Sequence, residues 1–103
     1  MAVQVTFTAR SGSVTTGGTS QQLAPALATR QYLLIQNPAT AAGQDVATAE
    51  SLFVRFGAAA GVNNGTSFEI LPGGSLELAD AVSIQEVLVV AATTARRWIA
   101  VEA

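Results

Sequence analysis

The feature that most limits the fold of this chain is a series of short hydrophobic runs between Arg30 and Leu78. Each of the first three runs closes on Asn, Gly or Pro, and the fourth follows a Pro-Gly-Gly turn. Short runs rich in β-branched and aromatic residues, separated by turn formers, are typical of antiparallel strands. The stretch therefore predicts an all-β fold. The four runs are RQYLLIQ, SLFVRFG, SFEILP and SLEL.

The same pattern continues along the whole chain and predicts about eight short strands at a spacing of roughly 8 to 12 residues. Such spacing indicates a single-domain antiparallel β-sandwich or a jelly-roll-like barrel. In the run at 31–36, apolar residues occupy both odd and even positions, so both faces of the strand are apolar. This predicts a central strand that is covered on both sides. The segment 22–30 is predicted as a short strand or a turn. The predicted strands are 2–8, 31–36, 52–56, 68–70, 76–78, 81–85, 86–92 and 97–102, the last two forming a hairpin.

At 103 residues the chain is predicted to be one domain, residues 1–103. Its first part, 1–10, is an N-terminal strand or arm in which Val3, Val5 and Phe7 share one face. A flexible Gly/Ser/Thr-rich connection is predicted at 11–21, before a sandwich body at 22–103. A strand tethered in this way either pairs with its own sheet or reaches a neighbouring subunit.

Turn positions are predicted from residues that tolerate positive φ or restrict the backbone. Asn64-Gly65-Thr66 also fits the acceptor pattern for N-glycosylation, but it is more simply a turn. The segment 39–50 is predicted as a long surface loop, with or without a helical turn at its end. The structural turn residues are Asn37, Gly57, Asn64, Gly65, Pro72, Gly73 and Gly74.

Composition excludes several classes of function. The chain has five Arg, no Lys, no His and no Cys, and its net charge is −2. Without a basic run we expect no nucleic-acid partner and no anionic membrane surface. Without Cys there is no disulfide and no thiolate metal site. The N-terminus lacks the pattern of a secretory signal, and no apolar run is long enough to span a membrane, so we expect a soluble protein made in a cytoplasm.

The ionisable residues do not suggest catalysis. Ser and Thr hydroxyls have no imidazole, amine or thiol to activate them, so only carboxylates remain as bases. Glu69, Glu77, Asp80 and Glu86 lie near one another in sequence, and we interpret them as solvated charges at strand edges and loops. Asp45 and Glu50 lack the dense oxygen ligands of a calcium loop. The prediction is therefore no enzyme, no cofactor, no metal and no small-molecule substrate.

Two further groups are candidate binding residues. Trp98 and Tyr32 lie in apolar strand patterns, which favours a place in the core over stacking on sugars or bases. Arg96 and Arg97 fall at the predicted hairpin turn, where they either pair with acidic groups of a partner or stay solvated.

Three segments, RQYLLIQN at 30–37, LFVRFG at 52–57 and FEILPGGS at 68–75, together resemble small virion proteins of tailed bacteriophages. The resemblance covers about two-thirds of the chain, from Arg30 to the end. Proteins of this kind include head decoration (cement) proteins and small tail or baseplate components. The resemblance implies a β-sandwich that assembles on a virion, often as a trimer, without catalysis. Its motif positions are structural turns and transfer no functional residue.

The function expected from the sequence is that of a capsid decoration protein, which binds the outside of the phage head and stabilises it. Its partners would be the major capsid protein and further copies of itself, as a homotrimer. It would be located on the virion surface after synthesis in the cytoplasm of the host bacterium. The expected contact residues are Val3, Val5, Phe7, Arg96 and Arg97.

The alternative is a receptor- or carbohydrate-binding module of a tail or baseplate. It predicts exposed aromatic residues beside the polar loops at 39–50 and 57–66.

Overall fold

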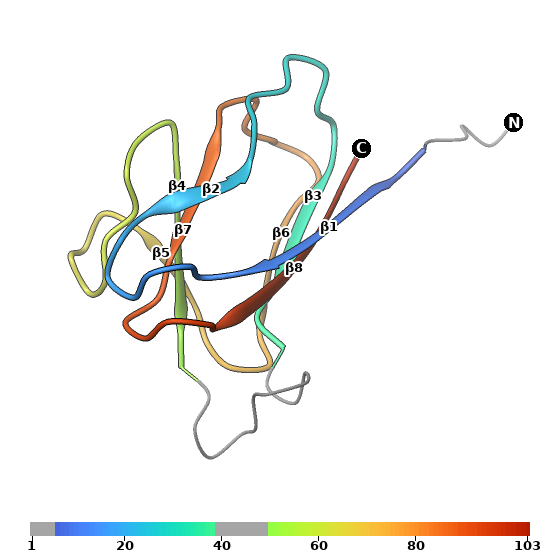
Figure 1. Ribbon diagram of the computed structural model, residues 1–103. Coiled ribbons are helices and arrows are strands. Elements are labelled where there is room, and N and C mark those ends of the chain that lie inside the picture. The colour runs from blue at the N-terminus through green and yellow to red at the C-terminus, as the bar shows by residue number, and fades with distance from the viewer. Residues whose placement is uncertain (1–5, 39–49) are drawn as a thin grey trace, which may run out of the picture.

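The computed structural model describes residues 6–38 and 50–103, which form eight β-strands (Figure 1). No helix in this part of the chain has the length and apolar character needed to cross a membrane. The strands are β1 (Thr8–Ser13), β2 (Gln21–Ala24), β3 (Leu33–Gln36), β4 (Leu52–Phe56), β5 (Phe68–Ile70), β6 (Ser75–Leu78), β7 (Val87–Val90) and β8 (Arg97–Glu102).

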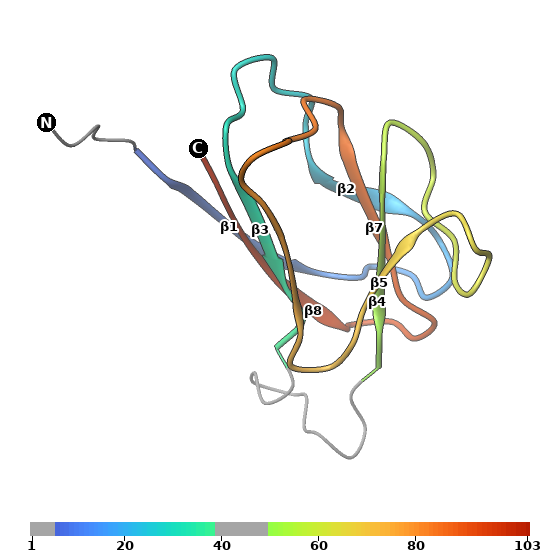
Figure 2. The ribbon, with the colours of Figure 1, turned by 180° about the vertical axis from the view of Figure 1, so that it is seen from behind.

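The strands form two four-stranded antiparallel sheets, ordered β1-β8-β3-β6 (sheet A) and β2-β7-β4-β5 (sheet B). The pairings are nested, because β1 pairs with β8, β2 with β7, β3 with β6 and β4 with β5. A long antiparallel ribbon folded over in this way is the jelly-roll topology. Figures 1 and 2 show the two sheets facing each other. The predicted all-β sandwich is confirmed, although the described strands do not close into a barrel.

The core lies between the sheets and is made by alternate residues of their strands. Leu33 and Ile35 of sheet A face Leu52 and Val54 of sheet B, and all four are almost fully buried. Burying side chains of this size contributes roughly 1.5–3 kcal/mol each, before the conformational entropy that opposes it. Trp98 closes one part of this core at 6% exposure, as its apolar strand pattern predicted.

The first strand lies later in the chain than predicted. It runs over Thr8–Ser13, so the predicted flexible connection at 11–21 begins with strand residues and includes Val14, which is fully buried. Gly12 lies opposite Trp98, and a Cβ added at Gly12 would stand 2.6 Å from the Trp98 Cζ2 atom. Glycine is therefore a packing requirement here and not a sign of a linker. The predicted strand residues 2–5 lie outside the described part of the chain.

The predicted C-terminal hairpin is wrong. β7 pairs with β2 and β4 in sheet B, whereas β8 pairs with β1 and β3 in sheet A. The link between them crosses from one sheet to the other and contains Ala95 at a φ of 69°. Both strands are central in their own sheets, so each has two partners and neither needs the other.

The predicted strand at 81–85 is also absent, and the segment is an irregular connection. Its apolar alternation is real, but the carbonyls of Ser83 and Gln85 accept hydrogen bonds from the Arg30 guanidinium. Because these acceptors are used by a side chain, they do not take part in a strand ladder.

Several predicted turn residues have backbone angles that suit glycine. Gly57, Gly65 and Gly73 have φ values of 76°, 76° and 80°. In the Asn-Asn-Gly turn, positive φ falls on Asn63 at 53°, while the Asn64 side chain accepts hydrogen bonds from Thr66.

A buried ion network joins β1, β8 and the β2–β3 connection at one end of the sandwich. The Arg30 side chain has no exposed surface, and its Nε donates to Glu102 Oε2 at 2.8 Å. Arg10 Nε donates to the other oxygen of Glu102, Oε1, at 2.6 Å. Glu102 is 2% exposed and sits on the inward side of β8, in the same parity as Trp98. A carboxylate with this burial requires both cations.

The rest of the Arg30 guanidinium binds backbone. Its Nη1 donates to the Ser83 and Gln85 carbonyls at 2.8 and 2.9 Å. Its Nη2 donates to the Pro25 carbonyl at 2.8 Å. These carbonyls belong to the β2–β3 and β6–β7 connections, which both cross between the sheets, so one side chain holds both crossings.

Asn37 has the corresponding place at the other end of β3. It is 1% exposed, and its Nδ2 donates to the carbonyls of Glu50 and Ile70 at 2.8 and 2.9 Å. Its backbone N–H donates to the Gly74 carbonyl at 3.0 Å, and its carbonyl accepts from the Gly73 N–H at 2.7 Å. The end of β3 is thereby joined to β5 and to the β5–β6 turn.

The pKa of Glu102 reflects this network. Burial alone would raise it, but hydrogen bonds from Arg30 and Arg10, together with their charges, outweigh burial and lower the pKa of Glu102 below its ordinary value of 4.5. The unfolded state therefore binds more protons than the folded state as the pH falls below that value. The network stabilises fully above it and is lost as the pH falls through the folded-state pKa.

We predict that Arg30→Ala lowers the free energy of unfolding by roughly 3–5 kcal/mol, because it leaves the buried Glu102 carboxylate and several carbonyls without their donor. Urea unfolding at neutral pH measures this. Arg55→Ala removes the same side chain from the outer surface of sheet B and should cost less than about 1 kcal/mol. Equal losses in the two variants would show that Arg30 does not hold the fold together.

We also predict that acid lowers stability less in Arg10→Ala than in the parent chain. Losing one donor moves the folded-state pKa of Glu102 back toward its ordinary value, so the pH-dependent part of the stability shrinks. Urea unfolding at a series of pH values from neutral to acid measures it, with Arg55→Ala as the control. Parallel pH profiles for all three proteins would contradict the assignment to Glu102.

Candidate functional site

The predicted contact residues do not gather in one place. Phe7 is 55% exposed, and its ring packs edge-on against Tyr32 with centroids 5.7 Å apart. Arg97 lies in β8, whereas Arg96 is largely buried, with its Nη2 3.5 Å from Glu50 Oε1. Val3 and Val5 lie outside the described residues. Phe7 and Arg97 thus share a surface that Arg96 does not reach.

That surface is the outward side of sheet A, which we call the outer face of sheet A. Strand parity and register place on it every second residue of the four strands, together with the adjoining Phe7 and Tyr32. Its members are Phe7, Ala9, Ser11, Ser13, Tyr32, Leu34, Gln36, Ser75, Glu77, Arg97, Ile99 and Val101.

The middle of the outer face of sheet A is apolar. Ala9, Val101 and Leu34 stand in register across three strands, and Ile99 lies in the next row at 39% exposure. Val101 and Leu34 are half-buried. Four neighbouring strands therefore present a flat surface with an apolar centre.

The outer side of sheet B is partly covered by its own chain. Phe53 and Val90 point outward from β4 and β7, and they are buried at 6% and 0% exposure. They form a small second core with Ala60 and Val62, which belong to the segment after β4. No comparable cluster forms on the outer face of sheet A within residues 6–38 and 50–103.

β3 was predicted to be a central strand with both sides covered. Its central position in sheet A is confirmed, with β8 and β6 on either side. Only its inward residues Leu33 and Ile35 are fully buried, because Leu34 points to the open outer face. The apolar residues at both parities did indicate a second contact surface, although the interpretation assigned that surface to the interior.

Tyr32 and Glu77 border the apolar centre of the outer face of sheet A. The Tyr32 hydroxyl donates to Glu77 Oε2 at 2.6 Å. This hydrogen bond raises the pKa of Tyr32 above its ordinary value, with smaller contributions from burial and from the charge of Glu77. Tyr32 thus lies on a surface as an amphipathic residue and not in the predicted core.

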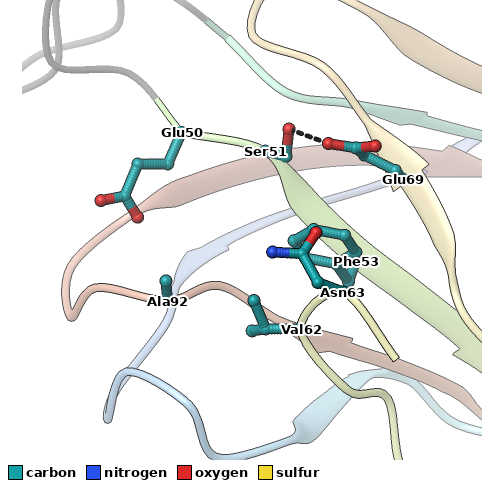
Figure 3. Close-up of a pocket in the computed structure, with 7 residues that line it drawn as sticks. All are labelled: Glu50, Ser51, Phe53, Val62, Asn63, Glu69 and Ala92. Carbon is teal, nitrogen blue, oxygen red and sulfur yellow. Dashed lines mark hydrogen bonds between the residues drawn. The ribbon is translucent and has the colours of Figure 1, made fainter. Parts of the chain in front are cut away.

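A first hollow, of about 220 Å³, lies beside β4 at the sheet B end of the molecule (Figure 3). Ser51 Oγ donates to Glu69 Oε2 at 2.6 Å, and Thr93 Oγ1 donates to Glu50 Oε1 at 2.5 Å. The buried Glu50 Oε2 accepts no hydrogen bond. Figure 3 shows Ser51 between the Glu50 and Glu69 side chains, with Glu50 pointing away from Glu69. The lining residues are Glu50, Ser51, Phe53, Val62, Asn63, Glu69 and Ala92.

A second hollow, of about 190 Å³, is lined by Gly65, Thr66, Ser67 and Phe68. Phe68 has the inward parity of β5, but it stands at the edge of sheet B and is 57% exposed. Its ring packs edge-on against Phe56 at 6.1 Å. Alternation with the buried Ile70 would direct Phe68 inward, but its position at the edge of a three-residue strand leaves the ring uncovered.

The acidic residues do not converge on one site. Glu69 accepts from Ser51, Glu77 from Tyr32, and Glu86 from Gln22 Nε2 at 2.6 Å. Within the described residues no group of three His, Cys, Asp or Glu side chains is placed to hold a metal ion. Asp45, considered as a calcium ligand, lies outside them. These carboxylates act as separate hydrogen-bond acceptors.

Comparison with protein-family models, curated proteins and solved structures finds no match to this chain. A function therefore has to be argued from the surfaces described above, beside the resemblance of the turn and strand motifs.

Proposed function

We propose that this protein is a structural virion protein that decorates the outside of a tailed-phage head and stabilises it. It would act by adhesion, as a homo-oligomer bound to the major capsid protein, on the virion surface. The resemblance of its strand and turn motifs to small phage virion proteins motivates the proposal. The observation that best supports it is the free edge of β1.

β1 is an edge strand of sheet A with six residues in continuous register with β8. Its outer side pairs with no described strand, although at its end the Ser13 carbonyl accepts from Gln21 Nε2 at 3.0 Å. Edge strands are commonly guarded by Pro, Lys, an inward-pointing charge or a bulge. β1 has no Pro, Lys or bulge, and its one inward charge, Arg10, is paired with Glu102. Such an edge suits the addition of a strand from another protein.

Phe7 adds an apolar anchor at the start of this edge. Its exposure of 55% is high for an aromatic side chain, and only Tyr32 provides a described ring contact. A ring in this position gains buried area when a partner surface covers it. Contacts made only with an assembled shell would stabilise that shell by mass action.

We predict that Phe7→Ser weakens binding to empty capsids at least tenfold without lowering the melting temperature. Co-sedimentation with capsids assembled from the major capsid protein encoded in the same genome measures the binding. Phe68→Ser is the matched control, because it removes an equally exposed Phe from the edge of sheet B. Deletion of residues 1–10 is a poorer test, because it also removes part of β1 and the Arg10 partner of Glu102.

Two results would count against the proposal. Failure of the unmodified protein to bind assembled capsids rejects the decoration function. Equal binding by Phe7→Ser and the unmodified protein rejects the role of the N-terminal edge.

The alternative function, a receptor- or carbohydrate-binding module, is favoured by the second hollow. Phe68 offers an exposed ring beside the hydroxyl groups of Thr66 and Ser67, which is the combination that sugar sites use. The Gly57–Thr66 loop was expected to border such an aromatic residue. In the first hollow, by contrast, Phe53 is too buried to serve as a stacking platform.

This alternative predicts binding on a glycan array that is lost in Phe68→Ser and retained in Phe7→Ser. The reason is that stacking on one exposed ring supplies much of the contact in a shallow sugar site. An array without any bound glycan would reject the module.

A further inference from the structure

The connection between β4 and β5 contains a chemically labile pair of residues, whose reactivity neither function above uses. Asn64 precedes Gly65, and both are exposed in the connection that Figure 1 shows at the sheet B side of the molecule. An asparagine amide followed by glycine is prone to attack by the next backbone nitrogen, because glycine has no Cβ to hinder the approach. The contacts around the pair decide whether the folded chain permits this attack.

The Asn64 carboxamide has one fixed orientation, set by the residues on either side of it. Its Oδ1 accepts hydrogen bonds from the Thr66 N–H at 3.0 Å and from the Thr66 hydroxyl at 2.8 Å. Its Nδ2 packs over Gly61, where an added Cβ would clash with it. A side chain that bonds the backbone two residues on forms an Asx-turn, which folds the carboxamide back over the intervening Gly65 peptide.

The Gly65 nitrogen is free to act as the nucleophile. Among the residues that the structure describes, no hydrogen bond uses the Gly65 N–H. A Cβ placed at Gly65 would meet no atom within 4 Å apart from its chain neighbours, so the backbone is open to solvent here. Water and hydroxide therefore reach both the N–H and the carboxamide.

We infer that Asn64 is a site of spontaneous deamidation. Hydroxide removes the Gly65 amide proton, and the nitrogen then attacks Asn64 Cγ. A new Cγ–N bond forms and the Cγ–Nδ2 bond breaks, so that Nδ2 leaves as ammonia with the equivalent of the proton that Gly65 lost. One water molecule then opens the succinimide at either of its carbonyls and gives aspartate or isoaspartate. Nothing is oxidised or reduced.

The Thr66 donors favour this reaction in the folded state. Negative charge develops on Oδ1 when Cγ becomes tetrahedral, and donors already placed at that oxygen stabilise the charge. The hydroxyl donor can be removed on its own, because valine has nearly the shape of threonine.

The other two asparagines of the chain lack this combination. Asn37 is 1% exposed and precedes Pro38, whose nitrogen carries no proton to lose. Asn63 is exposed, but the residue after it is Asn64, whose Cβ hinders approach to the attacking nitrogen. The structure therefore selects Asn64.

Deamidation changes the second hollow, because Gly65 and Thr66 are part of its lining. Both products place a negative charge where the unmodified chain has a neutral amide. Isoaspartate also adds one carbon atom to the main chain between residues 64 and 65. An aged molecule thus has a more acidic and differently shaped hollow, whereas the edge of β1 belongs to the other sheet. The inference depends on neither proposed function, since the reaction needs only water and the folded chain.

The test is incubation of the folded full chain at physiological temperature over a series of mildly alkaline pH values, followed by peptide mass spectrometry. Cleavage after Glu50 and Glu69 gives the peptide 51–69, which contains both Asn63 and Asn64. We expect the mass shift of a single deamidation, located at Asn64, with isoaspartate among the products. Its rate should rise with hydroxide concentration.

Thr66→Val separates the effect of the turn from that of the Asn-Gly sequence. It should slow deamidation of the folded protein roughly tenfold, less than the loss of a donor in a water-excluded site. Thr66→Ser keeps the hydroxyl and is the matched control, so it should react at the rate of the unmodified chain. In concentrated urea the turn is lost, and all three proteins should then react at the same rate.

An intact Asn64 after prolonged incubation of the folded chain would overturn the inference, and so would reaction at Asn63 in its place. Deamidation that occurs only in urea would also overturn it. Equal rates for folded Thr66→Val and Thr66→Ser would show that the turn does not assist the reaction.

Discussion

The rest of this structure depends on the contact between the buried guanidinium of Arg30 and the carboxylate of Glu102. A fully buried cation is costly unless every donor is used, and here Arg30 binds the carboxylate and three backbone carbonyls. The carbonyls belong to the two connections that cross between the sheets. A single side chain therefore holds the two crossing connections together at this end of the sandwich.

Asn37 has a comparable role at the opposite end of β3, where its side chain donates hydrogen bonds to the carbonyls of Glu50 and Ile70. The sandwich is thus apolar in the middle and closed at each end of one strand by a buried polar side chain. Short strands explain why such closures are needed, since strands of three to six residues direct at most three side chains inward each. Directional hydrogen bonds supply the register that so small an apolar core would specify weakly.

Local features of the sequence predicted most of the strands, because hydrophobic alternation and turn chemistry act over a few residues. All six strands from β3 to β8 begin and end within two residues of their predicted bounds. Local features do not predict which strands pair with one another. They do not distinguish a β7–β8 hairpin from a connection that passes from one sheet to the other. Gly12 and Ser13 resembled a linker because the ring of Trp98, which explains the glycine, is far away in sequence. The Arg30–Glu102 pair was missed for the same reason, although Glu102 shares the inward parity of Trp98 and Ala100, an unusual place for an unpaired carboxylate.

The candidate contact surface is the outer face of sheet A, and it arises because the two sheets differ in how their outer sides are covered. Both sheets carry apolar residues on their outer sides, at Leu34, Ile99 and Val101 in one and at Phe53, Leu88 and Val90 in the other. In sheet B the connection after β4 is long enough to fold back over them. In sheet A the β5–β6 turn is tight, and no segment within residues 6–38 and 50–103 packs over the outer side as the connection after β4 does in sheet B. Apolar residues on a face that the described residues leave open are the kind of surface on which a contact with another molecule can form, and this is why the proposal concentrates on sheet A.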